Sequence, residues 1–182
     1  MLSREQALAE VRARVAASPG RTVWVGVDGM GASGKTTWAE QLVAALPGAA
    51  LVGVDDFARP GVATWDHGLF TRQVLRPLLE GRPARWRRWD WRSGSPGGWC
   101  SAEPGHPVVV EGVSATDTAV PVPWDVLVWV EAPAEVRHAR ALARDGETAW
   151  REQWSRDWIP SEEAYRARQR PDLRADLVVD GR

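Results

Sequence analysis

The 182-residue chain has little cysteine, no charge excess and no long apolar run, and each absence excludes a class of protein. Cys100 is the single cysteine, so no disulfide can form within the chain. No apolar stretch is long enough to span a bilayer or to form the core of a signal peptide. Lys and Arg number 23 against 24 Asp and Glu, so the global charge indicates neither nucleic acid nor a membrane surface as a partner. We therefore expect a cytoplasmic protein.

Hydrophobic residues make up 44% of the sequence, which suits one domain with its own core, and we predict a single domain over residues 1–182. Apolar runs with little alternation, interspersed with helical patterns, predict a mostly parallel sheet with helices on both faces. The predicted strands are 22–27, 50–54, 108–110, 126–130 and 175–179. The predicted helices are 3–17, capped by a Ser3–Gln6 box within the N-terminal segment 1–18, then 35–46 and 65–79. The Pro- and Gly-rich segment 93–107 is expected to be a loop at the sheet edge.

Residues 29–36 read G-M-G-A-S-G-K-T, a complete G-x-x-x-x-G-K-[ST] phosphate-binding loop. Glycines let backbone N–H groups approach phosphate oxygens, and the helix that starts near Gly34 directs its positive end toward them. Lys35 would reach the β- and γ-phosphates, and Thr36 would offer its hydroxyl to Mg²⁺. The motif follows a predicted strand, opens a predicted helix and contains the only lysine of the chain, so a chance glycine-rich turn is the less favoured interpretation. The residues expected to bind the nucleotide are Gly29, Gly31, Ala32, Ser33, Gly34, Lys35, Thr36 and Thr37.

The chain contains no asparagine, which narrows the chemistry that this loop can serve. A guanine-specific GTPase reads its base with an N-K-x-D motif, which this sequence cannot provide. The sequence also lacks the LSGGQ signature of transporter ATPases, and its length leaves little room for motor or helicase machinery. A kinase for a small molecule is the interpretation that remains.

Further blocks follow the phosphate-binding loop in order along the chain. They are V-D-D-F at 54–57, W-D-H at 65–67, R-W-D-W at 88–91, V-V-V-E-G at 108–112, the arginines 137, 140 and 144, and A-D-L-V-V at 175–179. Together these blocks resemble those of the uridine kinase-like P-loop kinases, from about residue 21 to about residue 180. The resemblance implies an α/β P-loop NTPase three-layer sandwich with a short lid, and ATP and Mg²⁺ as cofactors. Relatives of uridine kinase act on several acceptors, so phosphoryl transfer to a hydroxyl is implied more strongly than uridine.

Three carboxylates stand at the ends of predicted strands. Asp55 and Asp56 follow the strand over 50–54, where one can accept the proton of an attacking hydroxyl and the other can organise water around Mg²⁺. The resemblance favours Asp55 as the base, while Asp56 is equally well explained as a cap of the next element. Glu111 ends the run 108–110, where a Walker-B-like carboxylate reaches the metal. Thr36, Glu111 and Asp56 are therefore the predicted metal site.

Arg137, Arg140 and Arg144 share one face of a helix predicted within 133–146, a pattern that by itself is typical of a solvated surface. In similar kinases a lid helix at this position carries arginines that close on the phosphates. The resemblance thus implies that Arg140 and Arg144 are catalytic together with Lys35, and that Arg137 is a further nucleotide contact. Arg144 can instead pair with its neighbour Asp145. Residues 147–158 predict a second amphipathic helix packed on the core.

The acceptor site is implied by the resemblance. Asp66 and His67 match the block whose aspartate holds sugar hydroxyls, and Asp66 could also cap the helix over 65–79. Trp89 and Arg92 fall in the segment that flanks the base in uridine kinases. Alternating Trp and Arg is also typical of a half-buried strand, and we favour core packing for tryptophans 86, 89 and 91.

Two departures from the family pattern, Ala58 after the V-D-D-F block and G-L at 68–69, point to a different or smaller acceptor. We expect ATP-dependent phosphorylation of a nucleoside-like metabolite, with uridine or cytidine first and a small-molecule hydroxyl compound as the partner. The alternatives are a kinase for another small alcohol and a non-catalytic ATP-binding switch.

Overall fold

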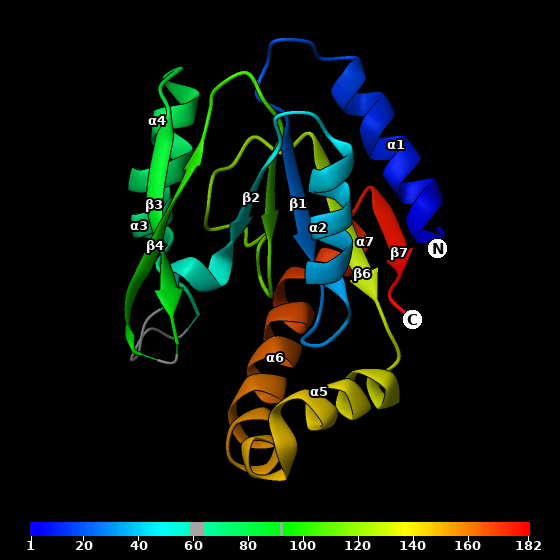
Figure 1. Ribbon diagram of the computed structural model, residues 1–182. Coiled ribbons are helices and arrows are strands. Elements are labelled where there is room, and N and C mark those ends of the chain that lie inside the picture. The colour runs from blue at the N-terminus through cyan, green and yellow to red at the C-terminus, as the bar shows by residue number, and fades with distance from the viewer. Residues whose placement is uncertain (59–63, 92) are drawn as a thin grey trace.

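The computed structural model describes residues 1–58, 64–91 and 93–182, and its centre is a parallel sheet of five strands in the order β2-β5-β1-β6-β7 (Figure 1). The strands are β1 Trp24–Asp28, β2 Ala50–Gly53, β5 Val108–Glu111, β6 Val126–Glu131 and β7 Leu177–Asp180. The register pairs Val27 with Glu111 and Asp28 with Trp129, so the carboxyl ends of the three central strands meet at one edge. All five predicted strands are present, and the predicted parallel sheet is confirmed.

Helices cover both faces of the sheet, as the pattern of apolar runs predicted. Alternate strand residues point to opposite faces, and a buried cluster forms on each side. On one face Val25 and Val27 pack with α1 (Arg4–Ala16) and α2 (Lys35–Ala45). On the other face Val108 and Val110 pack against the helical segment 67–79 and a hairpin.

The remaining helices are short or lie beyond the sheet. They are the 3₁₀ turn η1 Val54–Phe57, the continuous α3 His67–Phe70, η2 Thr71–Leu75 and α4 Arg76–Leu79, then α5 Ala134–Ala149, η3 Trp150–Trp158, α6 Ile159–Gln169 and α7 Pro171–Arg174. The predicted capping box is confirmed, because Ser3 N donates to Gln6 Oε1 at 2.9 Å and Gln6 N donates to Ser3 Oγ at 3.1 Å. In the described ranges no helix is long and apolar enough to cross a membrane.

The loop predicted over 93–107 is wrong for most of its length, because β4 (Ser95–Ala102) pairs antiparallel with β3 (Ala84–Asp90). Pro and Gly are tolerated in β4 because it has a partner on one side only, where missing donors and side chains cost little. The prediction that tryptophans 86, 89 and 91 pack in the core is confirmed for Trp86, which is 1% exposed, and is wrong for Trp91, which is 58% exposed. The hairpin turns only one face to the core.

The segment predicted as a second amphipathic helix on the core is helical, but it departs from that prediction in two ways. Gly146 has φ 83° and changes the direction of the chain inside α5, and residues 150–158 form π-helical turns. Trp154 is its buried residue, yet it packs on the phosphate-binding loop and belongs to neither core cluster. In Figure 1 the segment α5–α6 lies beyond the carboxyl ends of the strands, next to this loop.

Candidate functional site

The phosphate-binding loop connects β1 to α2 in a tightly packed turn. Gly34 stands at the helix start with φ 90°, a left-handed conformation that favours glycine. A Cβ at Gly29 would lie 2.7 Å from the Val130 carbonyl oxygen and 2.8 Å from Ser33 Oγ, so only glycine fits there. Ser33 Oγ is buried and has no hydrogen-bond partner among the described residues, which leaves a polar atom in the loop available to a ligand oxygen.

Lys35 and Thr36 open α2 beneath this loop. Lys35 is only 8% exposed, and its ammonium lies 3.5 Å from the Met30 carbonyl oxygen, so the side chain turns back along the loop. Thr36 Oγ1 donates to Glu111 Oε2 at 3.1 Å. Burial raises the pKa of Glu111, while the charge of Lys35 acts in the opposite direction. The fold thus brings the Thr36 hydroxyl to the Glu111 carboxylate, with the Lys35 ammonium close enough to act on the pKa of that carboxylate.

The donor set fits Mg²⁺ bound together with phosphate. A hydroxyl and a carboxylate are the hard oxygen ligands that this ion prefers, and Mg²⁺ usually takes its remaining ligands from water and phosphate. Among the described residues there is no group of three or more His, Cys, Asp or Glu side chains that could enclose a metal. Thr36 and Glu111 would therefore hold the ion from one side only.

Asp55 and Asp56 are adjacent in η1 but have different surroundings. Asp55 is exposed. Burial is the main cause that raises the pKa of Glu111, and the hydrogen bond that Arg144 donates to Asp145 is the main cause that raises the pKa of Arg144; the charge of Asp55 adds to both shifts. The charge of Asp55 therefore acts on both Glu111 and Arg144. Asp56 Oδ2 instead accepts a hydrogen bond from Trp86 Nε1 at 2.9 Å, and burial raises its pKa. Its carboxylate thus connects η1 to the hairpin.

Two of the three predicted arginines line a cavity of about 190 Å³ at the amino end of α2, together with Lys35 and Thr36. Arg140 Nη1 donates to Gly181 O at 2.7 Å and lies 3.5 Å from the carbonyl oxygens of Ala32 and Ser33. Arg144 also lines the cavity.

Arg144 is paired with the neighbouring Asp145 through two hydrogen bonds of 2.9 Å, the alternative that the sequence left open. The guanidinium also lies over the ring of Trp154 at 5.6 Å, and Trp154 Nε1 donates to Asp145 at 2.8 Å. Arg137 is a buried residue of α5, its Nε donates to Ala132 O at 3.3 Å, and it does not line the cavity.

A carboxylate that sequence reasoning missed also contacts the phosphate-binding loop. Glu162 of α6 accepts a hydrogen bond from Gly31 N at 2.7 Å and is 7% exposed. A Cβ at Gly31 would lie 2.5 Å from Trp154 Cζ3 and 2.7 Å from Glu162 Oε1. Burial raises the pKa of Glu162, and the Gly31 N–H, Lys35 and Arg137 oppose the rise. No spacing in the sequence indicated this contact, because it joins residues 131 positions apart.

Asp28, directly before the phosphate-binding loop, also connects that loop to α6. Its carboxylate is fully buried and accepts hydrogen bonds from Gly29 N at 2.8 Å, Ser114 N at 3.1 Å, Thr116 Oγ1 at 2.7 Å and Tyr165 Oη at 2.6 Å. Burial raises the pKa of both Asp28 and Tyr165. A buried acid with this many donors fixes the position of everything attached to it.

Of the predicted acceptor residues, Asp66 and His67 lie next to η1, which follows β2, because Asp66 N donates to Phe57 O at 2.9 Å. Asp66 Oδ1 accepts from Leu69 N at 2.7 Å, so Asp66 does cap the following helix. His67 Nε2 is buried without a hydrogen-bond partner in the described part of the chain, and its ring lies 4.2 Å from that of Trp65. Trp65 Nε1 donates to Ser114 Oγ at 3.2 Å, which connects this turn to the loop after β5.

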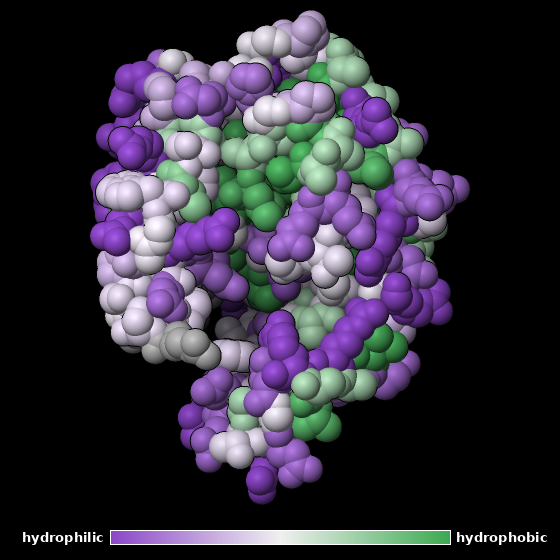
Figure 2. Space-filling view, in the orientation of Figure 1, coloured by the Kyte–Doolittle hydropathy of each residue, from purple (hydrophilic) through white to green (hydrophobic). Residues whose placement is uncertain are grey.

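Trp89 is half-buried in β3, with its ring 6.4 Å from that of Trp91. Arg92, the remaining acceptor candidate, lies outside the described residues. In the orientation of Figure 1, Figure 2 shows the surface hollowed below the strand ends, between the hairpin side and the segment α5–α6.

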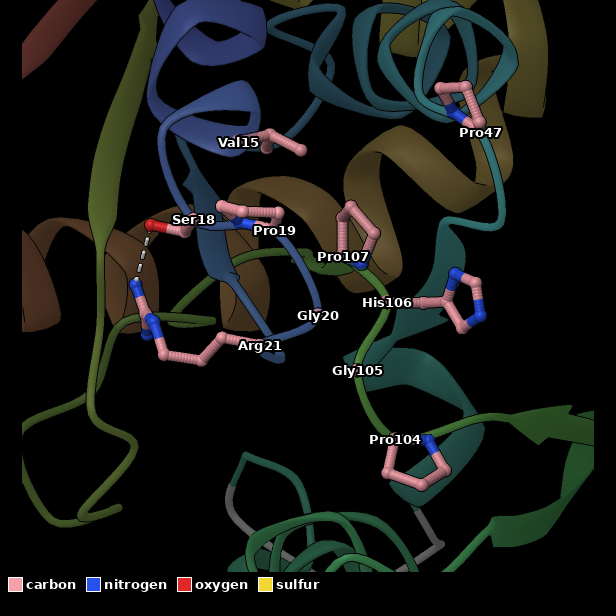
Figure 3. A pocket seen from close by; sticks show the side chains of 10 residues that line it. All are labelled: Val15, Ser18, Pro19, Gly20, Arg21, Pro47, Pro104, Gly105, His106 and Pro107. Atoms are coloured by element: carbon pink, nitrogen blue, oxygen red, sulfur yellow. Dashed lines mark hydrogen bonds between the residues drawn. The ribbon is translucent and has the colours of Figure 1, made fainter.

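A larger hollow, of about 600 Å³, lies at the amino ends of the strands, opposite the phosphate-binding loop (Figure 3). Its lining residues precede strands: Gly20 and Arg21 come before β1, Pro47 before β2, and residues 104–107 before β5. Arg21 is paired with Asp125 at 2.7 Å. This hollow is therefore separated from the phosphate-binding loop by the length of the strands.

No family model and no curated protein matches the sequence. Among solved structures, a possible uridine kinase from Bacillus stearothermophilus matches with a TM-score of 0.66 and 19% identity, covering 94% of this chain and 100% of that one. A candidate fructose transport system kinase from Silicibacter sp. TM1040 matches with a TM-score of 0.76 and 20% identity, covering 98% and 99%. The chain therefore has the fold of the uridine kinase-like P-loop kinases.

Proposed function

We propose that the protein is a kinase that transfers the γ-phosphoryl group of ATP to a hydroxyl of a small molecule. The observation that carries the proposal is the 3.1 Å pair of Thr36 and Glu111 beside the buried Lys35, at the end of a complete phosphate-binding loop. A nucleotide-binding loop alone would serve many functions. Thr36 and two arginines around one cavity, with Glu111 hydrogen-bonded to Thr36, suit phosphoryl transfer.

The donor would lie along the loop with its phosphates on backbone N–H groups and Ser33. Lys35 would neutralise charge on the β- and γ-phosphates, and Thr36 and Glu111 would hold Mg²⁺. The metal, when bound, supplies charge neutralisation at the phosphate oxygens. The predicted role of Asp56 as a further metal group is less favoured, because its carboxylate is engaged by Trp86.

Asp55 would accept the proton of the acceptor hydroxyl as its oxygen forms a bond to the γ-phosphorus. The bond between that phosphorus and the β,γ-bridging oxygen breaks, and ADP leaves. Arg140 and Arg144 would stabilise the charge on the transferring group. Arg144 already lines the cavity and would exchange its hydrogen bonds to Asp145 for bonds to the phosphoryl oxygens.

A nucleoside is the first acceptor to test, with uridine and cytidine first. Asp66 caps the helix with its Oδ1 atom, and its second carboxylate oxygen would accept from the acceptor. A carboxylate can accept hydrogen bonds from two neighbouring sugar hydroxyls. His67 Nε2 supplies a second polar atom in the same turn. The two neighbours carry the names of a nucleoside kinase and a sugar-linked kinase, so free sugars belong in the same test.

The experiment is a measurement of ADP formation by the purified protein with ATP and Mg²⁺ against nucleosides, sugars, polyols and hydroxy acids, with each product identified by mass. The proposal expects one class of hydroxyl compound to raise ADP formation well above the rate with water. Turnover of a non-nucleoside alcohol would support the kinase activity and show that the acceptor is not a nucleoside. ATP binding with no dependence on any acceptor would contradict the proposal and favour the ATP-binding switch.

A further inference from the structure

The beginning of the chain is held against the end of β7. Leu2 N donates to Val178 O at 2.8 Å, and Asp180 N donates to Leu2 O at 3.0 Å, so residue 2 continues the sheet beside β7. Ser3 then caps α1. These contacts place Arg4, the first residue of the helix, at the carboxyl edge of the sheet where the phosphate-binding loop also lies. In Figure 1 the two termini lie together on this side.

Arg4 meets Arg140 above the start of α2. Arg4 Nη2 donates to Gly181 O at 3.2 Å, and Arg140 Nη1 donates to the same oxygen at 2.7 Å. A Cβ at Gly34 would lie 3.0 Å from Arg4 Nη2 and 3.6 Å from Arg140 Nη1. Two guanidinium groups from residues far apart in the chain therefore converge on one residue of the phosphate-binding loop.

One carboxylate near this convergence, that of Asp180, attracts Arg4, but it is also hydrogen-bonded to Arg182. The oxygen that Arg4 and Arg140 share is a neutral carbonyl oxygen, so a single carboxylate that also pairs with Arg182 does not balance both guanidinium groups. The amino end of α2 adds positive potential at the same point. A guanidinium has five donors, and Arg4 uses two of them here, on Gly181 O and on Asp180 O at 3.4 Å, so donors and a flat face remain.

The sheet order indicates which part of a nucleotide would reach Arg4. Asp55 and Glu111 follow β2 and β5, on one side of the central β1, whereas Gly181 follows β7 on the other side. In phosphoryl transfer the attacking and leaving oxygens lie in line on opposite sides of the phosphorus. If the acceptor lies on the β2 side, as the proposed function requires, the ADP portion extends toward β6 and β7.

We propose that Arg4 is a donor-binding residue that contacts the nucleoside portion of ATP, with its guanidinium on the base or the ribose. The N-terminal helix thereby belongs to the nucleotide site. This inference rests on the proposed function for the direction of the nucleotide, and its test separates the two.

The test compares Arg4→Ala with Arg12→Ala, a matched removal of an exposed arginine from the same helix. Calorimetry with Mg²⁺ gives the Kd for ATP and for inorganic tripolyphosphate, which has the phosphates but neither base nor ribose. We expect Arg4→Ala to raise the Kd for ATP by about 5- to 50-fold, as removal of one well-placed hydrogen-bonding or stacking group does, and to leave tripolyphosphate within about twofold. Arg12→Ala should change neither.

Other outcomes overturn the inference in distinguishable ways. Equal weakening of ATP and tripolyphosphate would make Arg4 a phosphate contact, and no weakening of either would make it a structural tie between the two termini. Arg4→Lys, which keeps the charge and loses the planar fork, replaces the alanine variant if that variant does not fold, and it should weaken ATP alone. Wild-type protein that binds neither ligand would overturn the proposed function and the inference together.

Discussion

The proposed donor side and the proposed acceptor side of the site differ in how many buried contacts fix their residues in place. On the donor side Gly29 and Gly31 leave no room for a Cβ, and Asp28 is held by donors from three segments. On the proposed acceptor side Asp55 is exposed, and Asp66, His67 and Trp89 are half-buried. Buried contacts within the protein therefore fix the proposed donor side more tightly than the proposed acceptor side.

This contrast fits a general property of shared folds, in which the scaffold is constant and specificity lies in the side chains around it. It also means that substitutions on the two sides should separate binding of ATP from turnover. The predictions below use that separation, from the largest expected effect to the smallest.

Replacement of Lys35 by Ala should remove most of the phosphoryl-transfer activity. Its ammonium is the buried positive charge of the loop, so we expect kcat/KM to fall by about 10²–10³-fold, as loss of one preorganised charge does. Lys35→Arg should also fail, because a wide planar guanidinium does not replace a compact ammonium in this space. Steady-state kinetics of both variants measure this loss, and thermal unfolding is the control that each variant is still folded. An active Lys35→Arg variant would contradict the prediction.

Asp55→Asn and Asp56→Asn form a pair that divides turnover from structure. Loss of the proposed base should lower kcat by about 10²–10⁴-fold and leave the Kd for ATP within about twofold. Asp56→Asn should have a much smaller effect on kcat and mainly loosen the hairpin, because that carboxylate accepts from Trp86. The reverse ranking of the two variants would make Asp56 the catalytic group.

Mg²⁺ dependence should change with pH through Glu111. Burial raises the pKa of this carboxyl, so protons compete with the metal at higher pH than for an ordinary glutamate. Below the raised pKa, the apparent Mg²⁺ affinity should fall by about tenfold per pH unit, and above it the affinity should be constant. Mg²⁺ titrations of activity at several pH values measure this, and Glu111→Gln should bind weakly at every pH. An unchanged pH profile in that variant would assign the titration to another group.

The two faces of the hairpin give the smallest expected effect. Trp86→Phe removes the hydrogen bond to Asp56 and leaves that carboxylate short of a donor, which should lower the free energy of unfolding by about 1–3 kcal/mol. Trp99→Phe, on the exposed face, should change it by less than about 0.5 kcal/mol. Denaturant unfolding compares the two variants, and equal effects would mean that the exposed face is also packed.

Much of the fold could be predicted because its strands are short, nearly continuous apolar runs between helical patterns. The closeness of Thr36 and Glu111 could be predicted as well, since Thr36 lies at the start of α2 and Glu111 at the end of β5, and the parallel sheet brings these ends together. Strand β4 could not, because its Pro96 and Gly97 are typical of a loop and become a strand only by pairing with β3. The placement of Arg92 lies outside the described residues, and its acceptor role stays a prediction.

The sequence by itself determined the phosphate-binding loop, the strands of the parallel sheet and the residue types proposed to hold the metal, because these depend on local pattern and on the rules of parallel sheets. Only the tertiary structure decided the partners: Glu162 on the Gly31 amide, Asp56 on Trp86 rather than in the open, and Arg4 beside Arg140. Each of these contacts joins segments far apart in the chain. Such contacts follow from how helices pack after the sheet has formed, and no spacing in the sequence encodes them.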